Sequence, residues 1–188
     1  MQIFNMTYNW KGVLSKRAET KYIILHHRGG CGDALSIHAD HLKRGWSGIG
    51  YHFYVRKDGS VFKGRPIGTV GAHCTNYNSL SIGICFEGNF ENEVMTDVQI
   101  KSGRELVAYI RQLYPKAEVK RHRDFSATAC PGKNFVFEKI SKGVTQMTIE
   151  EAMEIVQAKA GLEDETIEFL LCYKYGEELF CKLAEAMR

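Results

Sequence analysis

The chain has 188 residues, of which 44% are hydrophobic and 25% are charged, and its formal net charge is +3. This length suits one ordinary domain with a small appendage, and the apolar fraction is sufficient for a buried core. No apolar run approaches the roughly 18 residues of a membrane-spanning helix, so we expect no membrane span. The N-terminus lacks the basic and apolar regions of a secretory signal, so we expect synthesis in the cytoplasm without a signal peptide.

Two parts of the chain differ strongly in charge. Residues 1–144 contain 21 Lys and Arg against 12 Asp and Glu, whereas residues 145–188 contain 4 against 10. The net charges are therefore +9 and −6, and this contrast predicts a main domain over 1–144 and a small acidic module over 145–188. The basic residues are dispersed and follow no nucleic-acid-binding motif, which favours an anionic wall polymer over a nucleic acid as a partner.

Hydrophobic periodicity predicts an α/β fold, with a central mixed β-sheet flanked by helices. The first helix should be capped by Ser36, and the second should be capped by Thr96 and end at Pro115. Asp58-Gly59 is typical of a tight hairpin turn between two strands. Apolar or alternating runs predict strands at 22–26, 51–56, 61–64, 81–87 and 119–122.

The acidic module is expected to form three short amphipathic helices. Apolar residues follow helical spacing over 149–160, 164–175 and 179–187. A module of about forty residues is near the lower size limit for independent folding. We therefore expect it to dock on the main domain, on a partner or on a second copy of the chain.

A histidine and a cysteine lie close together in the segment 121–131. His122 precedes Cys130 by eight residues, and a distant apolar run ends in His26 and His27. Two imidazoles and one thiolate form a three-ligand set for zinc, and a fourth position left to water makes such a site catalytic. Because the candidate ligands are scattered along the chain, the fold must bring them together, which favours an enzyme over a zinc finger.

Seven motifs occur in order between residues 20 and 140. They are Ile23–His27, Gly45–Phe53, Arg56–Gly59, Gly64–Pro66, Gly71–His73, Asn78–Gly83 and His122–Gly132. Together they resemble the zinc-dependent N-acetylmuramoyl-L-alanine amidases of the phage-lysozyme and peptidoglycan-recognition-protein superfamily. The whole is similar to endolysins or autolysins of phages and prophages of Gram-positive bacteria.

The resemblance implies that one Zn²⁺ binds to His26, His122 and Cys130. It places Tyr51 beside the zinc-bound water, where the phenol can hydrogen-bond the developing oxyanion. Thr128 is a further candidate catalytic residue, because some relatives have a lysine and recognition proteins have a threonine at this position. Its hydroxyl offers a neutral hydrogen bond where lysine offers a charge. The implied reaction is hydrolysis of the amide bond between N-acetylmuramic acid and L-alanine in peptidoglycan.

The resemblance also implies a groove that binds the peptidoglycan substrate. His73 matches a histidine of this groove, and Asn78 opens the motif that follows. Along a strand, successive side chains point to opposite faces, so His27 should point away from the face that carries His26. We therefore assign His27, His73 and Asn78 to substrate binding and not to the metal.

Two other functions remain open. One is a peptidoglycan-binding or recognition module without catalysis, but inactive recognition proteins of this fold typically replace the cysteine ligand, whereas Cys130 is present here. The other is a regulatory protein that binds a partner enzyme, as some phage relatives do. The acidic module is open to wall targeting, for example through an anionic wall polymer, and to self-association. In the favoured hypothesis, the protein acts on the cell wall after release through a holin-type pore.

Overall fold

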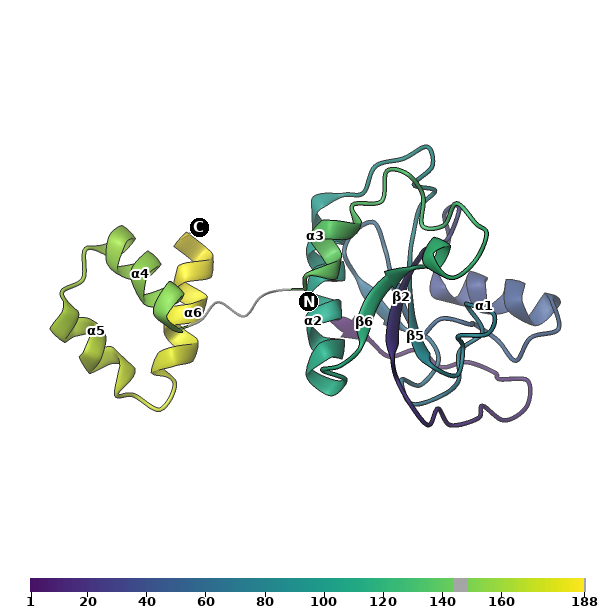
Figure 1. Cartoon of the computed structure of the whole chain (residues 1–188), viewed down its shortest axis with the longest axis horizontal. Helices are drawn as coiled ribbons and strands as arrows, with labels where there is room; N and C mark the ends of the chain where they lie inside the picture. The colour runs from purple at the N-terminus through teal and green to yellow at the C-terminus, as the bar shows by residue number, and fades with distance from the viewer. Residues whose placement is uncertain (144–148, 188) are drawn as a thin grey trace. The chain divides into compact units, whose positions relative to one another are not determined.

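The structure is a computed structural model that describes residues 1–143 and 149–187. It divides into two compact units, Met1–Gly143 and Val144–Arg188, and each is considered by itself (Figure 1). The boundary that the charge pattern predicts, between residues 144 and 145, lies outside the described residues. Within the described residues, no helix is long and apolar enough to cross a membrane.

Unit 1 (Met1–Gly143) is built on a mixed sheet whose described strands lie in the order β1-β4-β3-β5-β2-β6. β3 and β4 pair antiparallel, and all other neighbours pair parallel. The α/β fold with a central mixed sheet is therefore confirmed. The strands are β1 (Ile3–Phe4), β2 (Tyr22–His27), β3 (Phe53–Val55), β4 (Val61–Lys63), β5 (Ser81–Phe86) and β6 (Glu118–Arg121).

β5 and β2 are adjacent interior strands of the sheet. Every residue of β5 is buried, as are the four inner residues of β2. Their sequences are short continuous apolar runs, which is typical of parallel strands that are covered on both faces. All five predicted strands are present, with shifts of one or two residues at their ends. β1 was not predicted because two residues are too few to show a period.

Helices cover both faces of the sheet (Figure 1). α2 (Asp97–Leu113) and α3 (Phe137–Ser141) lie against one face, and α1 (Ala34–Lys43) lies against the other. Strand alternation divides the buried side chains between two cores. Ile84 of β5 belongs to the core beneath α2, whereas the adjacent Cys85 belongs to the core beneath α1.

The helix starts test the predicted caps. Thr96 caps α2 as predicted, because its side chain accepts a hydrogen bond from the Gln99 N–H at 3.2 Å. The prediction for the first helix was wrong: Asp33 is the cap, and its carboxylate accepts the Ser36 N–H at 2.7 Å. Ser36 lies inside the first turn, because the stronger carboxylate acceptor three residues earlier begins the helix.

Unit 2 (Val144–Arg188) contains three short helices in its described part. They are α4 (Ile149–Ala160), α5 (Asp164–Leu171) and α6 (Gly176–Met187). α5 ends four residues earlier than predicted, and α6 begins three residues earlier than the predicted third helix. Their inward faces form a separate core, whose fully packed members are Ala152, Val156, Ile167, Phe180 and Ala184.

His52 is a fully buried histidine that joins the sheet to a neighbouring loop in unit 1. Its Nδ1 accepts the Gly83 N–H at 3.0 Å, so Nε2 carries the proton and donates to the Thr69 carbonyl at 2.9 Å. Burial lowers the pKa of His52 to about 3. The folded protein therefore keeps this imidazole neutral across the range in which an unfolded chain would protonate it.

We predict that acid destabilises unit 1 partly through His52. The unfolded imidazole has a pKa of about 6.5, so the unfolded state binds more protons as pH falls, and stability falls with it. Between pH 7 and pH 5 this residue should account for about 2 kcal/mol of the loss. Urea unfolding of the metal-free protein, followed by tryptophan fluorescence, measures this loss, and His52→Asn should reduce it by that amount. Equal pH dependence of the two proteins would contradict the assignment.

Candidate metal centre

The structure brings together the three candidate ligands His26, His122 and Cys130. Each offers one ligand atom, and the three atoms all lie within 4.8 Å of one another. His26 is near the end of β2, and His122 directly follows β6 in a short 3₁₀ turn. β2 and β6 are parallel neighbours with Leu25 opposite Arg121, so the next residues, His26 within β2 and His122 just past β6, lie at the same edge of the sheet.

The separations suit a single zinc ion. The Cys130 Sγ lies 3.9 Å from the His26 Nδ1, and the rings of His26 and His122 are 4.5 Å apart between centroids. Tetrahedral zinc, with Zn–N distances of about 2.0 Å and Zn–S distances of about 2.3 Å, holds its ligand atoms roughly 3.3–3.6 Å apart. Small side-chain movements would therefore suffice, and three protein ligands leave one position for water or substrate.

His73 sets the orientation of His26. The His26 Nε2 and the His73 Nδ1 share a hydrogen bond of 3.0 Å, and both side chains are buried. This bond turns the other ring nitrogen of His26 toward Cys130. Burial lowers the pKa of both imidazoles well below the usual value, which keeps them neutral. A neutral, hydrogen-bonded imidazole is the form that binds a metal.

Cys130 is a nearly buried thiol, with 9% of its surface exposed. Burial raises its pKa to about 11, and the His27 backbone N–H, which donates to Sγ at 3.4 Å, acts in the opposite direction. The metal-free protein therefore holds a protonated thiol at neutral pH. A metal ion must displace this proton to bind, so metal binding is coupled to proton release.

Tyr51 lies beside this cluster, as its motif predicts. Its ring centroid is 5.2 Å from that of His26, 5.8 Å from that of His41 and 6.2 Å from that of His73. Burial raises the pKa of the Tyr51 phenol well above 10, with the neighbouring Cys85 adding to the effect. The phenol is therefore protonated at neutral pH and can donate a hydrogen bond.

A cavity of about 400 Å³ opens next to the cluster and has His122 in its wall. Two of the three residues assigned to the substrate groove, His73 and Asn78, also line it. The other residues of the cavity wall were not predicted from the sequence, although they lie within the recognised motifs or just after them. They are Trp46, Ala72, Cys74 and Thr75.

Three predicted site residues use their polar atoms to hold the backbone. The Asn78 Oδ1 accepts the N–H groups of His73 and Cys74 at 2.7 and 2.9 Å, which shapes the cavity wall. The His27 Nδ1 accepts the Phe90 N–H, from the loop after β5, at 3.2 Å, and His27 does not line the cavity. The exposed Thr128 accepts the Cys130 N–H at 3.2 Å.

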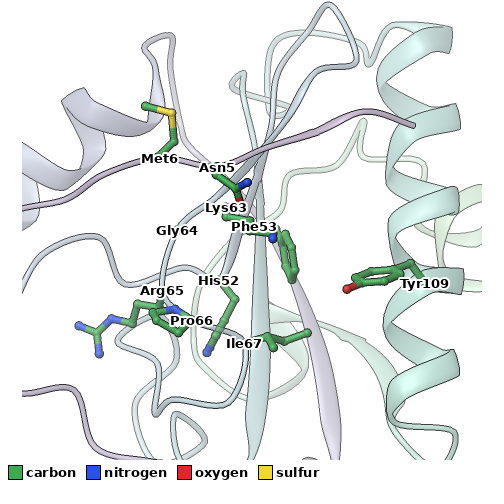
Figure 2. Close-up of a pocket in the computed structure, with 10 residues that line it drawn as sticks. All are labelled: Asn5, Met6, His52, Phe53, Lys63, Gly64, Arg65, Pro66, Ile67 and Tyr109. Carbon is green, nitrogen blue, oxygen red and sulfur yellow. The ribbon is translucent and has the colours of Figure 1, made fainter.

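A second cavity, of about 320 Å³, contains none of the three candidate ligands (Figure 2). Tyr109 of α2 and Phe53 of β3 are among the residues that line it. It shares no lining residue with the cavity beside the candidate metal centre, so the two cavities are distinct.

The comparisons with known proteins agree with this geometry. Residues 16–133 match the N-acetylmuramoyl-L-alanine amidase family, so the chain belongs to that family. Both endolysins and peptidoglycan-recognition proteins occur among its relatives, which confirms the resemblance inferred from the motifs.

Three relatives represent the recognition proteins, the phage endolysins and the amidases of known structure. Peptidoglycan-recognition protein SC2 of Drosophila melanogaster is 38% identical over 126 residues, which cover 60% of this chain and 68% of that protein. The endolysin of Enterobacteria phage K11 is 32% identical over 126 residues, which cover 62% of this chain and 83% of the endolysin. The structure of N-acetylmuramoyl-L-alanine amidase LysC from Clostridium intestinale URNW matches with a TM-score of 0.72 and 36% identity. That match covers 87% of this chain and 99% of LysC.

We predict that His26→Ala, His122→Ala and Cys130→Ser each lose bound zinc, because two strong ligands hold the ion far more weakly than three. Metal content after dialysis, measured by mass spectrometry, should fall below about a tenth of an ion per chain. Cys74→Ser is the matched control, since it replaces a buried thiol of the cavity wall outside the cluster. Full zinc content in any ligand variant would contradict the ligand set.

Proposed function

We propose that the protein is a zinc-dependent peptidoglycan hydrolase that cleaves the amide bond between N-acetylmuramic acid and L-alanine. The observation that carries this proposal is the cluster of His26, His122 and Cys130 in and beside the wall of a cavity. Membership of the amidase family and similarity to endolysins support it.

In this proposal His26, His122 and Cys130 hold one Zn²⁺. A zinc ion bound there supplies a Lewis acid that polarises a carbonyl group and makes water nucleophilic near neutral pH. His73 keeps His26 in the ligand orientation through the 3.0 Å hydrogen bond between their rings. The cavity lined by Trp46, His73 and Thr75 would take the substrate next to these ligands.

Tyr51 would act on the carbonyl oxygen. Its protonated phenol can donate a hydrogen bond to the oxygen as negative charge develops there, and a donor fixed by packing needs no reorganisation. Thr128 would have a smaller, indirect role, because its hydroxyl oxygen accepts the Cys130 N–H and so holds the backbone of a ligand. His27 and Asn78 would likewise shape the site through the backbone groups that they bind.

Peptidoglycan recognition without hydrolysis is the second candidate function. The identity of 38% to recognition protein SC2 favours it, and one matched structure is that of peptidoglycan recognition protein-LE in complex with tracheal cytotoxin, a monomeric peptidoglycan. The presence of Cys130 together with both histidines favours hydrolysis instead. Loss of turbidity of purified cell walls, with and without a chelator, separates the two, since a recognition module would leave the walls intact.

Unit 2 would be an accessory unit that directs the enzyme to the cell wall, where the protein would arrive through a holin-type pore. The match to LysC covers 87% of this chain, whereas unit 1 accounts for only 143 of the 188 residues. The match therefore includes part of unit 2. Three exposed aromatic residues gather in one short segment of unit 2 and provide an interaction surface. They are Phe169, Tyr173 and Tyr175, which are 61%, 61% and 64% exposed.

We predict that Tyr51→Phe lowers turnover by about 10²–10³-fold without loss of zinc, as expected for removal of one oxyanion donor. Release of the stem peptide from a soluble muropeptide measures turnover, and metal analysis measures zinc. Tyr77→Phe is the control, because it removes a phenolic hydroxyl from a ring that packs against that of Phe125, outside the cluster. Turnover near that of the unchanged protein would show that Tyr51 has no part in the reaction.

We also predict that a chain ending at Gly143 folds, binds zinc and cleaves the soluble muropeptide at a rate close to that of the full chain, because each unit has its own core. Its lysis of whole cell walls should fall. Failure to fold or to cleave the soluble substrate would place unit 2 in the catalytic part. If wall lysis is unchanged and light scattering shows fewer chains per particle than in the full-length protein, unit 2 serves self-association instead of targeting.

A further inference from the structure

The loop that carries two of the three candidate ligands contains little regular secondary structure. His122 and Cys130 lie eight residues apart, and the segment between them contains only a three-residue 3₁₀ turn as regular structure. A metal site tolerates errors of only a few tenths of an ångström in ligand position. Something other than regular secondary structure must therefore hold the two ends of this loop at a fixed separation.

Arg123 supplies that connection. Its backbone N–H donates to the Cys130 carbonyl at 3.0 Å, and its Nη2 donates to the Gly132 carbonyl at 2.5 Å. Arg123 directly follows His122, so one residue ties the first ligand to the backbone on both sides of Pro131. Its side chain is half-buried, and its Nε–H is buried and finds no hydrogen-bond partner among the described residues.

The neighbouring Arg121 shows that this is not a general property of the arginines in the segment. The guanidinium group of Arg121 pairs with Asp124, with an N–O distance of 3.0 Å, and lies over the ring of Phe137 at 5.0 Å. None of its hydrogen bonds or ion pairs among the described residues reaches Cys130 or Gly132. Two arginines that are two residues apart therefore hold different parts of the loop.

We propose that Arg123 is a positioning residue of the metal centre, which fixes the Cys130–Gly132 backbone so that the thiol faces His26 and His122. The inference rests on the proposed function, in that a metal must bind at this cluster. A residue that orients a ligand through hydrogen bonds typically contributes about 10–100-fold in metal affinity. Arg123 does not reach the cavity wall, so its contribution passes through Cys130.

The test measures zinc affinity of the full chain by competition with a chelator. Arg123→Met keeps the backbone N–H and an unbranched stem in place of that of arginine but removes the guanidinium group and its bond to Gly132, so affinity should fall about 10–100-fold. Arg123→Lys retains a donor and should recover part of the loss. Arg121→Met is the matched control and should bind zinc as the unchanged protein does. In the cobalt-substituted protein, the thiolate-to-metal absorption band should weaken in Arg123→Met alone.

A metal-free measurement separates this inference from the proposed function. In chelated protein, the rate at which iodoacetamide alkylates Cys130, followed by peptide mass mapping, should rise in Arg123→Met and stay constant in Arg121→Met. Loss of the Arg123 charge, which lowers the pKa of this thiol, would by itself slow alkylation, so a rise reports that the loop has loosened. If the unchanged protein binds no zinc, the proposed function fails while this rate still reports on the loop. Unchanged zinc affinity and an unchanged alkylation rate in Arg123→Met would overturn the positioning role, as would equal losses in Arg123→Met and Arg121→Met.

Discussion

The parallel pairing of β2 with β6 is the constraint on which the candidate metal centre depends. Parallel strands run in the same direction, so their carboxyl ends meet at one edge of the sheet. Leu25 lies opposite Arg121, and the next residues, His26 and His122, therefore emerge side by side although 96 positions separate them. A slip of one residue in this register would turn His26 toward the core beneath α2 and dismantle the cluster.

Buried neutral imidazoles surround this edge and suit it to the cation that we propose. The rings of His26 and His73 lie 5.0 Å apart, and those of His73 and His52 lie 5.7 Å apart. Burial lowers the pKa of all three, because a charged imidazole would lose its hydration. Hydrogen bonds replace that hydration for the neutral forms. A divalent ion therefore meets nitrogen ligands already held in place, without repulsion from protonated neighbours.

The strands and helix ends that could be predicted follow from local features of the sequence, namely apolar runs and capping residues. The continuous apolar runs of β2 and β5 indicate strands covered on both faces, and Thr96 marks the start of α2. Ser36 was misassigned because two residues able to cap a helix lie three positions apart, and the choice between them depends on backbone conformation at Asp33. β1 escaped prediction because its order comes from pairing with β4, a contact distant in sequence.

The amino-acid order alone establishes the chemical character of the site: two imidazoles, one thiol and one tyrosine in an ordered series of motifs that resembles the amidase family. Which atoms face one another depends on the folded chain. In the folded chain the Nδ1 of His26 faces Cys130 and the Nε2 faces His73. The side-chain oxygens of Asn78 and Thr128 accept hydrogen bonds from backbone N–H groups. The reason is physical, because periodicity reports the face on which a side chain lies, whereas its partners depend on strand register and loop closure between distant segments.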